Sequence, residues 1–489
     1  MKEAGLKEII LVNDVGTTSV RTCAIDISNG SIVSQASHKY AWHHTKEGWT
    51  TMDPYEIWNG SVASFGKVLD EIRNDSKILA ITFSYIGDST ILADSEGNAL
   101  YEMIPAFDSR AQQEIAEIQK IVGNDRYIEL TGGPVELGCM SGKILWLQKH
   151  EKELFKQKVR YFSIQQFFNA RMGLEPVNDY SLASRKTMYD SRKGCWASEI
   201  LEKLNISEEE LGKVISADSI LGETRRYGDV ELPYPVPVIL GAHDSECGLY
   251  GAGVSVDTPE YIANIAGTFD HLEFLDHEFH NYFPVYGNMM FRAPLKGDYV
   301  SLDASIAGSS IQWFLENIYG TGENPFDDLY GHIEFNGENR LVYLPGLEDS
   351  NAMFLNLNAS HTKYDMYQAI IEGITYKLKQ TTENYAKIHP GRFRAVRAGG
   401  GGCKAAKWMQ LKADMFGMPV EVAENLEISS VGSAAMAAVG IGAYQSMKEA
   451  TDRMVSVGKV YEPNMETAER YAQRFAQYKD KYMPLKKEL

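Results

Sequence analysis

Near its N-terminus the chain reads Glu8-Ile9-Ile10-Leu11-Val12-Asn13-Asp14-Val15-Gly16-Thr17-Thr18-Ser19-Val20-Arg21. This pattern predicts an apolar strand, a Gly-Thr-Thr-Ser turn and a second apolar strand that opens with an Arg. Glycine lets the backbone approach a ligand closely, and the N–H and hydroxyl groups of Thr17 and Thr18 are suited to hold phosphate oxygens. Asp14 is a candidate ligand for a hydrated divalent cation, and Arg21 for the outermost phosphate. The motif alone leaves an ordinary hairpin turn open, because Gly and Thr are common in turns.

The length and charge of the chain limit its fold class and its partners. At 489 residues it is too long for one ordinary core, which predicts two large domains. Hydrophobic residues make up 44% and charged residues 23%, as in ordinary globular proteins. The formal charge of −18 disfavours non-specific binding to nucleic acid or anionic lipid. A nucleotide is not excluded, because it needs only a local cluster of donors.

The sequence carries no sign of a membrane span or of secretion. No run of about 18 apolar residues occurs, and residues 1–5 lack the pattern of a secretory signal. The five cysteines form no close pair and show no zinc-finger spacing; they are Cys23, Cys139, Cys195, Cys247 and Cys403. We therefore expect buried free thiols in a reducing cytoplasm.

The first part of the chain alternates between strands and helices. Strands are expected at residues 8–13, 20–27 and 31–40, a helix at residues 54–72, and further strands at residues 77–84 and 90–93. Residues 112–170 are expected to be mostly helical. This alternation indicates an α/β domain with a mixed sheet.

A second Gly-Thr turn lies half a chain away. The run Tyr261-Ile262-Ala263-Asn264-Ile265-Ala266-Gly267-Thr268-Phe269 is again an apolar strand that enters such a turn. The repetition indicates a duplicated architecture in which two related domains each offer a phosphate-holding hairpin, although Gly-Thr is frequent enough to recur by chance. Without a low-complexity linker, the boundary is expected in a tight hinge near residues 244–258, with domains at residues 1–246 and 247–489.

Four consecutive glycines mark the late part of the chain, at Ala398-Gly399-Gly400-Gly401-Gly402-Cys403-Lys404. They leave room for a flat or bulky group against the backbone. The helix expected at residues 405–416 begins there, and its N-terminus favours an anion or a polar ring edge. A flexible turn is the alternative. Residues 430–440 predict a helix of small residues that packs very closely against a neighbour.

Asp244 is the candidate for acid–base chemistry. It follows a predicted strand at residues 235–240, and a carboxylate at such a strand end can accept a proton from a hydroxyl that attacks a phosphoryl group. The alternative is a helix cap for residues 245–250. Asp88 and Asp108 lie in polar clusters at the ends of apolar runs, where they suit the hydroxyls of a sugar or polyol. For both, an ordinary surface loop is the alternative.

Taken in the order in which they occur along the chain, these sequence segments resemble the FGGY carbohydrate kinases of the actin-like and sugar-kinase ATPase superfamily. The run from Asp14 to Arg21 looks like the first phosphate loop of that family. Further segments resemble it at Met52-Asp53-Pro54 with Trp58, Ser141-Gly142-Lys143-Ile144-Leu145-Trp146-Leu147 and Asn178-Asp179-Tyr180-Ser181-Leu182-Ala183-Ser184-Arg185. Residues 241–248, 267–268, 399–408 and 434–442 follow in family order, so the resemblance covers nearly the whole chain.

The resemblance implies an α/β fold of two ribonuclease-H-like domains around a central cleft that closes on ATP and Mg²⁺. By this resemblance Asp14 helps to place the magnesium ion, and Asp244 is the catalytic base and a substrate contact. The implied nucleotide contacts are Thr17, Thr18, Arg21, Gly267 and Thr268 near the phosphates, with Gly400 and Gly401 near the adenine and ribose. The implied activity is ATP-dependent phosphorylation of a hydroxyl of a sugar or polyol.

Departures from the family pattern bear on the substrate. Ile86-Gly87-Asp88 stands where glycerol kinases carry Gln-Arg-Glu and xylulokinases Gln-Met-His. Ala106-Phe107-Asp108-Ser109-Arg110 lacks the usual Trp, and His243-Asp244-Ser245 is similar to the His-Asp-Thr of deoxysugar kinases. We therefore expect a ketose, a deoxyketose or a related polyol rather than glycerol.

Two other functions remain open at this point. One is a kinase of a hydroxylated signalling compound, for which the altered Asp88 and Phe107 positions leave room. The other is a nucleotide-binding regulatory protein without transferase activity, against which the retained Asp14, Arg21 and Asp244 argue. A homodimer is a further expectation, although no segment of the sequence identifies an interface.

Overall fold

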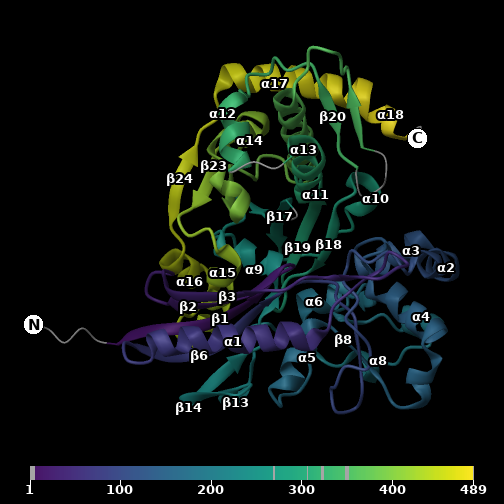
Figure 1. The fold of residues 1–489 in the computed structure, drawn as a ribbon, viewed down its shortest axis with the longest axis vertical. Coiled ribbons are helices and arrows are strands. Elements are labelled where there is room, and N and C mark those ends of the chain that lie inside the picture. Colours follow the sequence, from purple (N-terminus) through teal and green to yellow (C-terminus); the bar gives the residue numbers. More distant parts are fainter. Residues whose placement is uncertain (1–5, 268–269, 306, 321–323, 347–351, 488–489) are drawn as a thin grey trace, which may run out of the picture. The chain divides into compact units, whose positions relative to one another are not determined.

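The computed structural model describes residues 6–267, 270–305, 307–320, 324–346 and 352–487 (Figure 1). Its contacts divide the chain into two compact units. Unit 1 comprises residues 1–257, 275–301 and 428–455, and unit 2 comprises residues 258–274, 302–427 and 456–489. Each unit contains a mixed sheet with helices, which confirms the expected α/β class. Among the described residues, no helix combines the length and the apolar character needed to cross a bilayer.

The main sheet of unit 1 is built on the expected hairpin. Its strand order is β13-β14-β6-β1-β2-β3, with β15 added beside β6. The bounds are β1 Lys7–Val15, β2 Ser19–Asp26, β3 Ile32–Lys39, β6 Ser76–Tyr85, β13 Ile220–Tyr227, β14 Val230–Ile239 and β15 Ala242–His243. β1 and β2 pair antiparallel with Asp14 opposite Arg21, whereas β1 and β6 run parallel with Asp14 beside Ser84. The fold therefore places three polar side chains at one end of adjacent strands.

Helix α1, Pro54–Ile72, covers one face of this sheet. Asp53 caps it by accepting a hydrogen bond from the Tyr55 N–H at 3.0 Å, and Pro54 opens it with a preset φ. The apolar residues on which the helix was predicted are all buried: Ile57, Val62, Phe65, Val68, Leu69 and Ile72. They pack with Ile9 and Leu11 of β1, so these alternate residues face α1. Asp14, of opposite parity, points to the other face.

A largely helical region of unit 1, residues 112–211, has its own hydrophobic core; it includes the predicted helical stretch at residues 112–170 and continues beyond it. Its helices are α2 Gln112–Val122, α3 Asn124–Thr131, α4 Met140–His150, η1 Lys152–Lys156, α5 Ile164–Arg171, α6 Tyr180–Arg185, α7 Ser198–Leu204 and α8 Glu208–Leu211. Short strands lie beside them: β4 His43–His44, β5 Thr50–Thr51, β7 Ile91–Ala93, β8 Arg160–Phe162, β9 Asn178–Asp179, β10 Tyr189–Asp190, β11 Cys195–Trp196 and β12 Val214–Ile215.

Two helices with glycines at their contact pack tightly against each other in unit 1. They are α9, Asp244–Gly251, and α15, Ile428–Gly440. A methyl group on Gly432 would lie 1.8 Å from the Cys247 carbonyl oxygen, and one on Gly251 would lie 1.8 Å from that of Ile428. This contact confirms the predicted close packing of the small-residue helix. It also fixes α9, whose first residue is Asp244.

Unit 2 repeats the hairpin arrangement. β16 Tyr261–Ala266 pairs antiparallel with β17 Asp270–Asp276 and parallel with β22 Ala395–Gly399, followed by β23 Val420–Ala423 and β24 Val457–Tyr461. Gly267 follows β16 as Gly16 follows β1, whereas Thr268 and Phe269 lie outside the described residues. The same hairpin, with a parallel neighbour, thus occurs in each unit.

The helices of unit 2 include α13 Lys363–Ile388, η3 Gly401–Lys404, α14 Ala406–Phe416 and α17 Met465–Gln477. The remaining elements of the chain are α10 Phe283–Tyr286, β18 Met289–Arg292, β19 Tyr299–Ser305, α11 Ala307–Phe314, η2 Leu315–Tyr319, α12 Pro325–His332, β20 Val342–Leu344, β21 Met353–Leu355, α16 Met447–Met454, η4 Tyr478–Tyr482 and α18 Met483–Lys487.

Candidate functional site

The Gly-Thr turn of unit 1 is held from outside by two aromatic side chains. The Tyr40 hydroxyl donates to the Gly16 carbonyl, and the Trp42 indole donates to the Thr17 carbonyl at 2.8 Å. The Gly16 N–H donates to the Ser19 carbonyl at 3.0 Å, which closes the turn. Thr18 is exposed, and Gly16 and Thr17 are half-buried. The turn is therefore a fixed loop that presents backbone and hydroxyl groups to the surface of unit 1.

Asp14 lies beside this turn and close enough to Asp244 for their charges to interact. Burial raises the pKa of Asp14 to about 6; the negative charge of Asp244 adds to this, while Ser84 and Arg21 oppose it. Two carboxylates that repel each other are a favourable arrangement for a hard divalent cation, which prefers oxygen ligands. No cluster of three or more His, Cys, Asp or Glu side chains suited to a metal occurs among the described residues. Asp14, with the negative charge of Asp244 nearby, fits a hydrated Mg²⁺, because this ion keeps several waters and binds through one or two carboxylates.

Asp244 is the first residue of α9, and its side chain is 35% exposed. The N-cap position belongs to His243, so the capping alternative for Asp244 is wrong. The Ser429 hydroxyl donates to the Asp244 carbonyl at 3.0 Å, which ties the helix start to α15. The Asp244 carboxylate is thus held on a rigid helix end and remains accessible.

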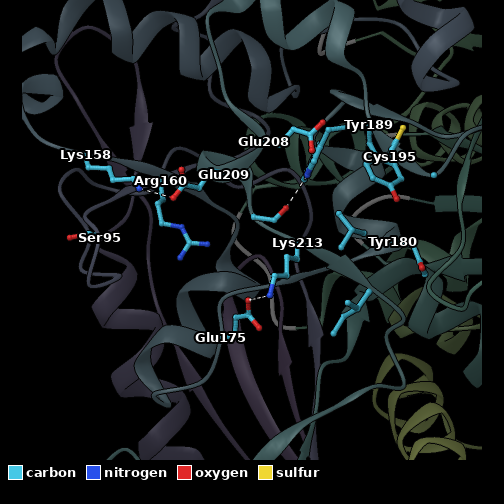
Figure 2. Close-up of a pocket in the computed structure, with 15 residues that line it drawn as sticks. Ser95, Lys158, Arg160, Glu175, Tyr180, Tyr189, Cys195, Glu208, Glu209 and Lys213 are labelled. Atoms are coloured by element: carbon cyan, nitrogen blue, oxygen red, sulfur yellow. Dashed lines mark hydrogen bonds and ion pairs between the residues drawn. The ribbon is translucent and has the colours of Figure 1, made fainter.

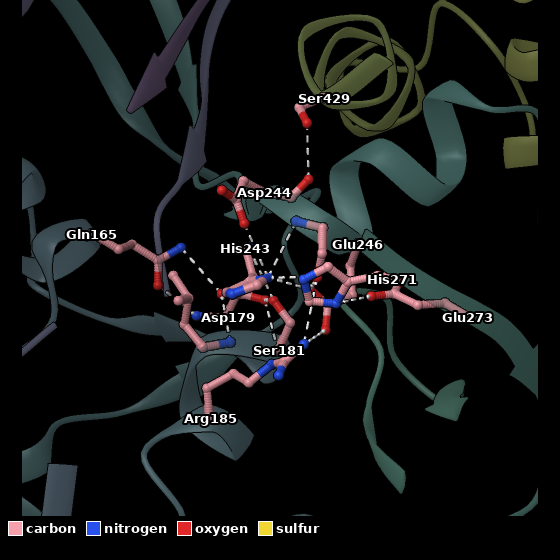
Figure 3. A network of polar contacts seen from close by, with 12 residues as sticks. Gln165, Asp179, Ser181, Arg185, His243, Asp244, Glu246, His271, Glu273 and Ser429 are labelled. Atoms are coloured by element: carbon pink, nitrogen blue, oxygen red, sulfur yellow. Dashed lines mark hydrogen bonds and ion pairs between the residues drawn. The ribbon is translucent and has the colours of Figure 1, made fainter. Parts of the chain in front are cut away.

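His243 belongs to a buried network of charges behind Asp244 (Figure 3). Its Nδ1 lies 2.6 Å from Oε2 of Glu246 and 3.4 Å from Oδ1 of Asp244. Arg185 contacts the other Glu246 oxygen at 3.2 Å. Burial disfavours a charged ring, but Glu246 and, less strongly, Asp244 outweigh it and raise the pKa of His243 to about 9. Burial likewise opposes ionisation of Glu246, yet His243 and Arg185 hold its pKa well below the usual range.

A second set of polar contacts fixes the strand that carries His243. The Gln165 amide donates to the Gly241 carbonyl at 3.1 Å and to Asp179 at 3.3 Å. The Ser181 hydroxyl donates to Asp179 at 2.5 Å and accepts from the His243 N–H at 3.2 Å. Burial raises the pKa of Asp179 to about 6. Helices α5 and α6 therefore support the end of β15 from one side.

Asp88 lies close to this network, three residues after the end of β6. Its backbone is left-handed, with φ of 54°, and its carbonyl accepts from Lys143 Nζ at 3.1 Å. Burial raises the pKa of Asp88, whereas Arg185, His243 and Lys143 act in the opposite direction. A methyl group on Gly87 would lie 2.1 Å from Nε2 of His243, so the ring packs directly on this backbone. The structure thus brings Asp88, His243 and Asp244 into one region of unit 1.

Asp108 has different surroundings. Its fully buried carboxylate accepts from Arg110 Nε at 2.6 Å, from Arg110 Nη2 at 3.1 Å and from the Thr50 N–H at 2.6 Å. The Arg110 guanidinium lies 5.0 Å from the ring centres of both Trp49 and Trp146. These contacts favour a structural role for Asp108. Its assignment as a substrate ligand stays a prediction.

In unit 2, the glycine run lies against the second hairpin. A methyl group on Gly400 would lie 2.6 Å from the Ala266 carbonyl oxygen, and Gly400 has a φ of 96°, so this position requires glycine. Gly401 is exposed, with open space where a side chain would begin. Gly267 and Gly400 are therefore close together, and Gly401 leaves the room expected for a flat ligand. Thr268 lies outside the described residues.

A buried ion pair connects the same hairpin to α14. Lys412 contacts Asp270 at 2.7 Å, with the two side chains 0% and 1% exposed. Lys412 also donates to the Asn264 amide oxygen at 2.7 Å, and the Asn264 amide nitrogen donates to Asp270. In unit 1 the matching Asn13, also three residues before the turn glycine, accepts from Thr22 at 2.8 Å and from Ser61 of α1 at 3.1 Å. Each hairpin is therefore fastened by a buried asparagine.

A separate hollow of about 750 Å³ lies in unit 1, around Arg160, Tyr180, Cys195 and Trp196 (Figure 2). Two ion pairs line it, Lys158–Glu209 at 2.6 Å and Lys213–Glu175 at 2.7 Å. None of the residues predicted for the site lines this hollow.

Arg185, His243 and Glu246 lie within the sequence segments that resemble the family, but they were not predicted as site residues. The spacing His243-Asp244-Ser245-Glu246 carries a signal, because residues three apart in a first helical turn lie side by side. Arg185 is separated from them by about sixty residues of sequence, so its contact with Glu246 became visible only in the fold.

Known proteins resemble the chain over almost its full length. Xylulose kinase of Staphylococcus epidermidis is 24% identical over 505 residues, which cover 98% of both chains. L-fuculokinase of Escherichia coli is 25% identical over 473 residues, covering 91% of this chain and 95% of the relative. The crystal structure of gluconate kinase from Lactobacillus acidophilus has a TM-score of 0.87 at 23% identity, with 98% of both chains covered. The likeness confirms the expected fold with two ribonuclease-H-like domains.

Family assignment rests on two sequence profiles. Residues 9–251 match the N-terminal domain, and residues 304–441 the C-terminal domain, of the FGGY family of carbohydrate kinases. The chain therefore belongs to the FGGY family of carbohydrate kinases, enzymes that transfer a phosphoryl group from ATP to a hydroxyl of a sugar or polyol.

Proposed function

We propose that this carbohydrate kinase phosphorylates a ketose, a deoxyketose or a related polyol, with Asp244 as general base. The observation that carries the proposal is the accessible Asp244 carboxylate at the rigid start of α9, beside His243 and near Asp88. Relatives named xylulose kinase and L-fuculokinase agree with a polyhydroxylated acceptor. No comparison favours a signalling compound or a regulatory protein without activity.

Each side chain has a distinct task in this proposal. The Asp244 carboxylate accepts the proton of the acceptor hydroxyl as its oxygen bonds to the transferred phosphorus and ADP leaves. Asp88 and His243 hold neighbouring acceptor oxygens, one by accepting and the other by donating hydrogen bonds. In this way the acceptor is oriented before the reaction, which supplies much of the acceleration in phosphoryl transfer.

Nucleotide contacts are proposed in each unit. In unit 1, Thr17, Thr18 and Arg21 would contact phosphate oxygens, and Asp14 would hold Mg²⁺. In unit 2, Gly267, Thr268, Gly400 and Gly401 contact the nucleotide. Bound Mg²⁺ neutralises phosphate charge, while Arg21 adds a fixed positive charge on the protein side. The support is the fixed Gly16–Thr18 turn and the open backbone at Gly401.

Replacement of Asp244 by Asn tests the base. The variant keeps the shape of the side chain but cannot accept the proton, so we expect acceptor-dependent ADP release to fall by at least about a hundredfold. Nucleotide binding, measured by thermal stabilisation with a non-hydrolysable ATP analogue, is expected to persist. Full turnover in Asp244→Asn would remove Asp244 from the mechanism.

A panel of ketoses, deoxyketoses and polyols tests the acceptor. With ATP and Mg²⁺, ADP release is expected only with a matching acceptor, and absence of release across the panel would contradict the substrate class. The cytoplasmic location and the homodimer are proposed alongside. Cell fractionation tests the location, and sedimentation equilibrium tests the dimer.

A further inference from the structure

Glu246 is a buried carboxylate to which the proposed reaction gives no task. It lies in the first turn of α9 and is 0% exposed. Its oxygens meet His243 Nδ1 at 2.6 Å, Arg185 Nη2 at 3.2 Å and the Ser245 hydroxyl at 2.9 Å. Because an isolated buried carboxylate is costly, such a group is retained only with partners of opposite charge.

The contacts of Glu246 determine which way the His243 ring faces. Nδ1 lies 3.2 Å from the Ser245 N–H and 2.8 Å from the Ser245 hydroxyl, but its shortest contact is the Glu246 oxygen at 2.6 Å. This contact with a carboxylate favours a proton on Nδ1 that is donated to Glu246. Nε2 is then directed away from Glu246, onto the backbone of Gly87, which precedes Asp88. The ring is held between Glu246 on one side and the Gly87 backbone on the other.

Arg185 completes the arrangement from another helix. It ends α6, whose start is fixed by Asp179, and it contacts both Glu246 and the Ser245 hydroxyl. Its guanidinium lies 5.2 Å from the centre of the Phe291 ring, which limits its position further. Through Arg185, the first turn of α9 is tied to the helical part of unit 1.

We propose that Glu246, paired with Arg185, is a positioning residue that fixes the His243 ring and the start of α9 for acceptor binding. This inference rests on the proposed function, since it places His243 and Asp244 at the acceptor. Loss of the Glu246 charge removes the charged partner at the shortest distance from Nδ1 and leaves the ring held by Ser245 and, at 3.4 Å, by Asp244. Acceptor binding is therefore weakened, whereas nucleotide binding is not affected.

Glu246→Gln is the variant that tests this proposal. Glutamine keeps the size of the side chain but removes the charge. Because the substitution removes a charge-assisted hydrogen bond, we expect the acceptor KM to rise about tenfold to a hundredfold. The KM for ATP is expected to stay within about twofold, a split that general destabilisation would not produce.

A matched control is available in unit 2. Glu372 is also a buried carboxylate, 1% exposed, and meets Arg474 at 3.2 Å and the Tyr471 hydroxyl at 2.8 Å. Glu372→Gln is expected to lower thermal stability like Glu246→Gln while leaving the acceptor KM unchanged. An equal rise of acceptor KM in both variants would overturn the proposal.

A second variant keeps the proposal testable if Glu246→Gln does not fold. Should Glu246→Gln not fold, Arg185→Met combined with Glu246→Leu removes both charges together, which a buried pair tolerates better than removal of one. We expect the same rise in acceptor KM. Wild-type acceptor KM in either variant would refute the role of Glu246, whereas full activity of Asp244→Asn would refute the proposed function itself.

Discussion

At the scale of single residues, the site combines groups of opposite charge at short range. Asp14, Asp88, Asp244 and Glu246 supply carboxylates, and His243 contacts Glu246 and Asp244, whose charges raise its pKa to about 9 against the effect of burial. The sequence alone did not show which of these groups contact one another. Asp14 and Asp244 were predicted as site residues because each follows an apolar run, and this is a local pattern in the sequence. The buried contacts of Glu246 with Arg185, and of Asp108 with Arg110 between two Trp rings, depend on tertiary packing.

The raised pKa of His243 predicts a pH-dependent contribution to stability. Charges that act on the ring come from Glu246, Asp244 and Arg185. A folded-state pKa above the unfolded value means that the contribution is fully present below about pH 6.5 and is lost as the pH rises through about 9. A shift of this size corresponds to about 2–4 kcal/mol for this buried group.

Denaturant unfolding of wild type and His243→Asn between pH 6 and pH 10 measures this contribution. The stability advantage of the wild type is expected to be largest at pH 6 and to shrink toward pH 10, because other titrating groups are common to both proteins. Parallel stability curves for the two proteins would show that the ring is not held charged in the folded state.

At the scale of elements, local sequence patterns were sufficient to predict much of the fold. Helix α1 has the predicted bounds and buried face, and both hairpins and the glycine-rich transition before α14 occur where expected. These features depend on periodicity, capping and glycine, which are local properties. The return of residues 428–455 to unit 1 depends on long-range packing, and no local signal marks it. The predicted boundary at residue 246 remains a prediction.

The contact between α9 and α15 supports a prediction at this scale. In Gly432→Ala the new methyl group meets the Cys247 carbonyl oxygen at 1.8 Å, so the helices must separate. Overpacking of this kind costs roughly 1–3 kcal/mol, and it displaces the helix that carries Asp244. We expect a lower melting temperature and a reduced kcat.

Gly331→Ala is the control for this variant. Gly331 also lies in a helix, α12, but a methyl group there meets nothing within 4 Å. Alanine is the better helix former, so this change is expected to be neutral or slightly stabilising. Wild-type stability and kcat in Gly432→Ala would show that the two helices tolerate separation.

At the scale of the whole molecule, each of the two units contains the same kind of hairpin, but different contacts stabilise it. Unit 1 uses neutral hydrogen bonds at Asn13, whereas unit 2 uses the Lys412–Asp270 ion pair with Asn264. The sequence indicated the duplication through two Gly-Thr turns, and the second sheet confirms it. The sequence did not indicate the buried ion pair, because Lys412 and Asp270 are about 140 residues apart in the chain.

This difference allows one unit to be perturbed separately. Loss of Lys412 alone leaves Asp270 buried without its partner, which costs about 3–5 kcal/mol, so the variant Lys412→Met is best combined with Asp270→Asn. Because the pair joins the second hairpin to the helix after the glycine run, its removal loosens Gly267 and Gly400. We expect the KM for ATP to rise about tenfold while the acceptor KM stays within about twofold. Steady-state kinetics with each substrate varied measures both values, and a rise confined to the acceptor KM would contradict nucleotide binding by this part of unit 2.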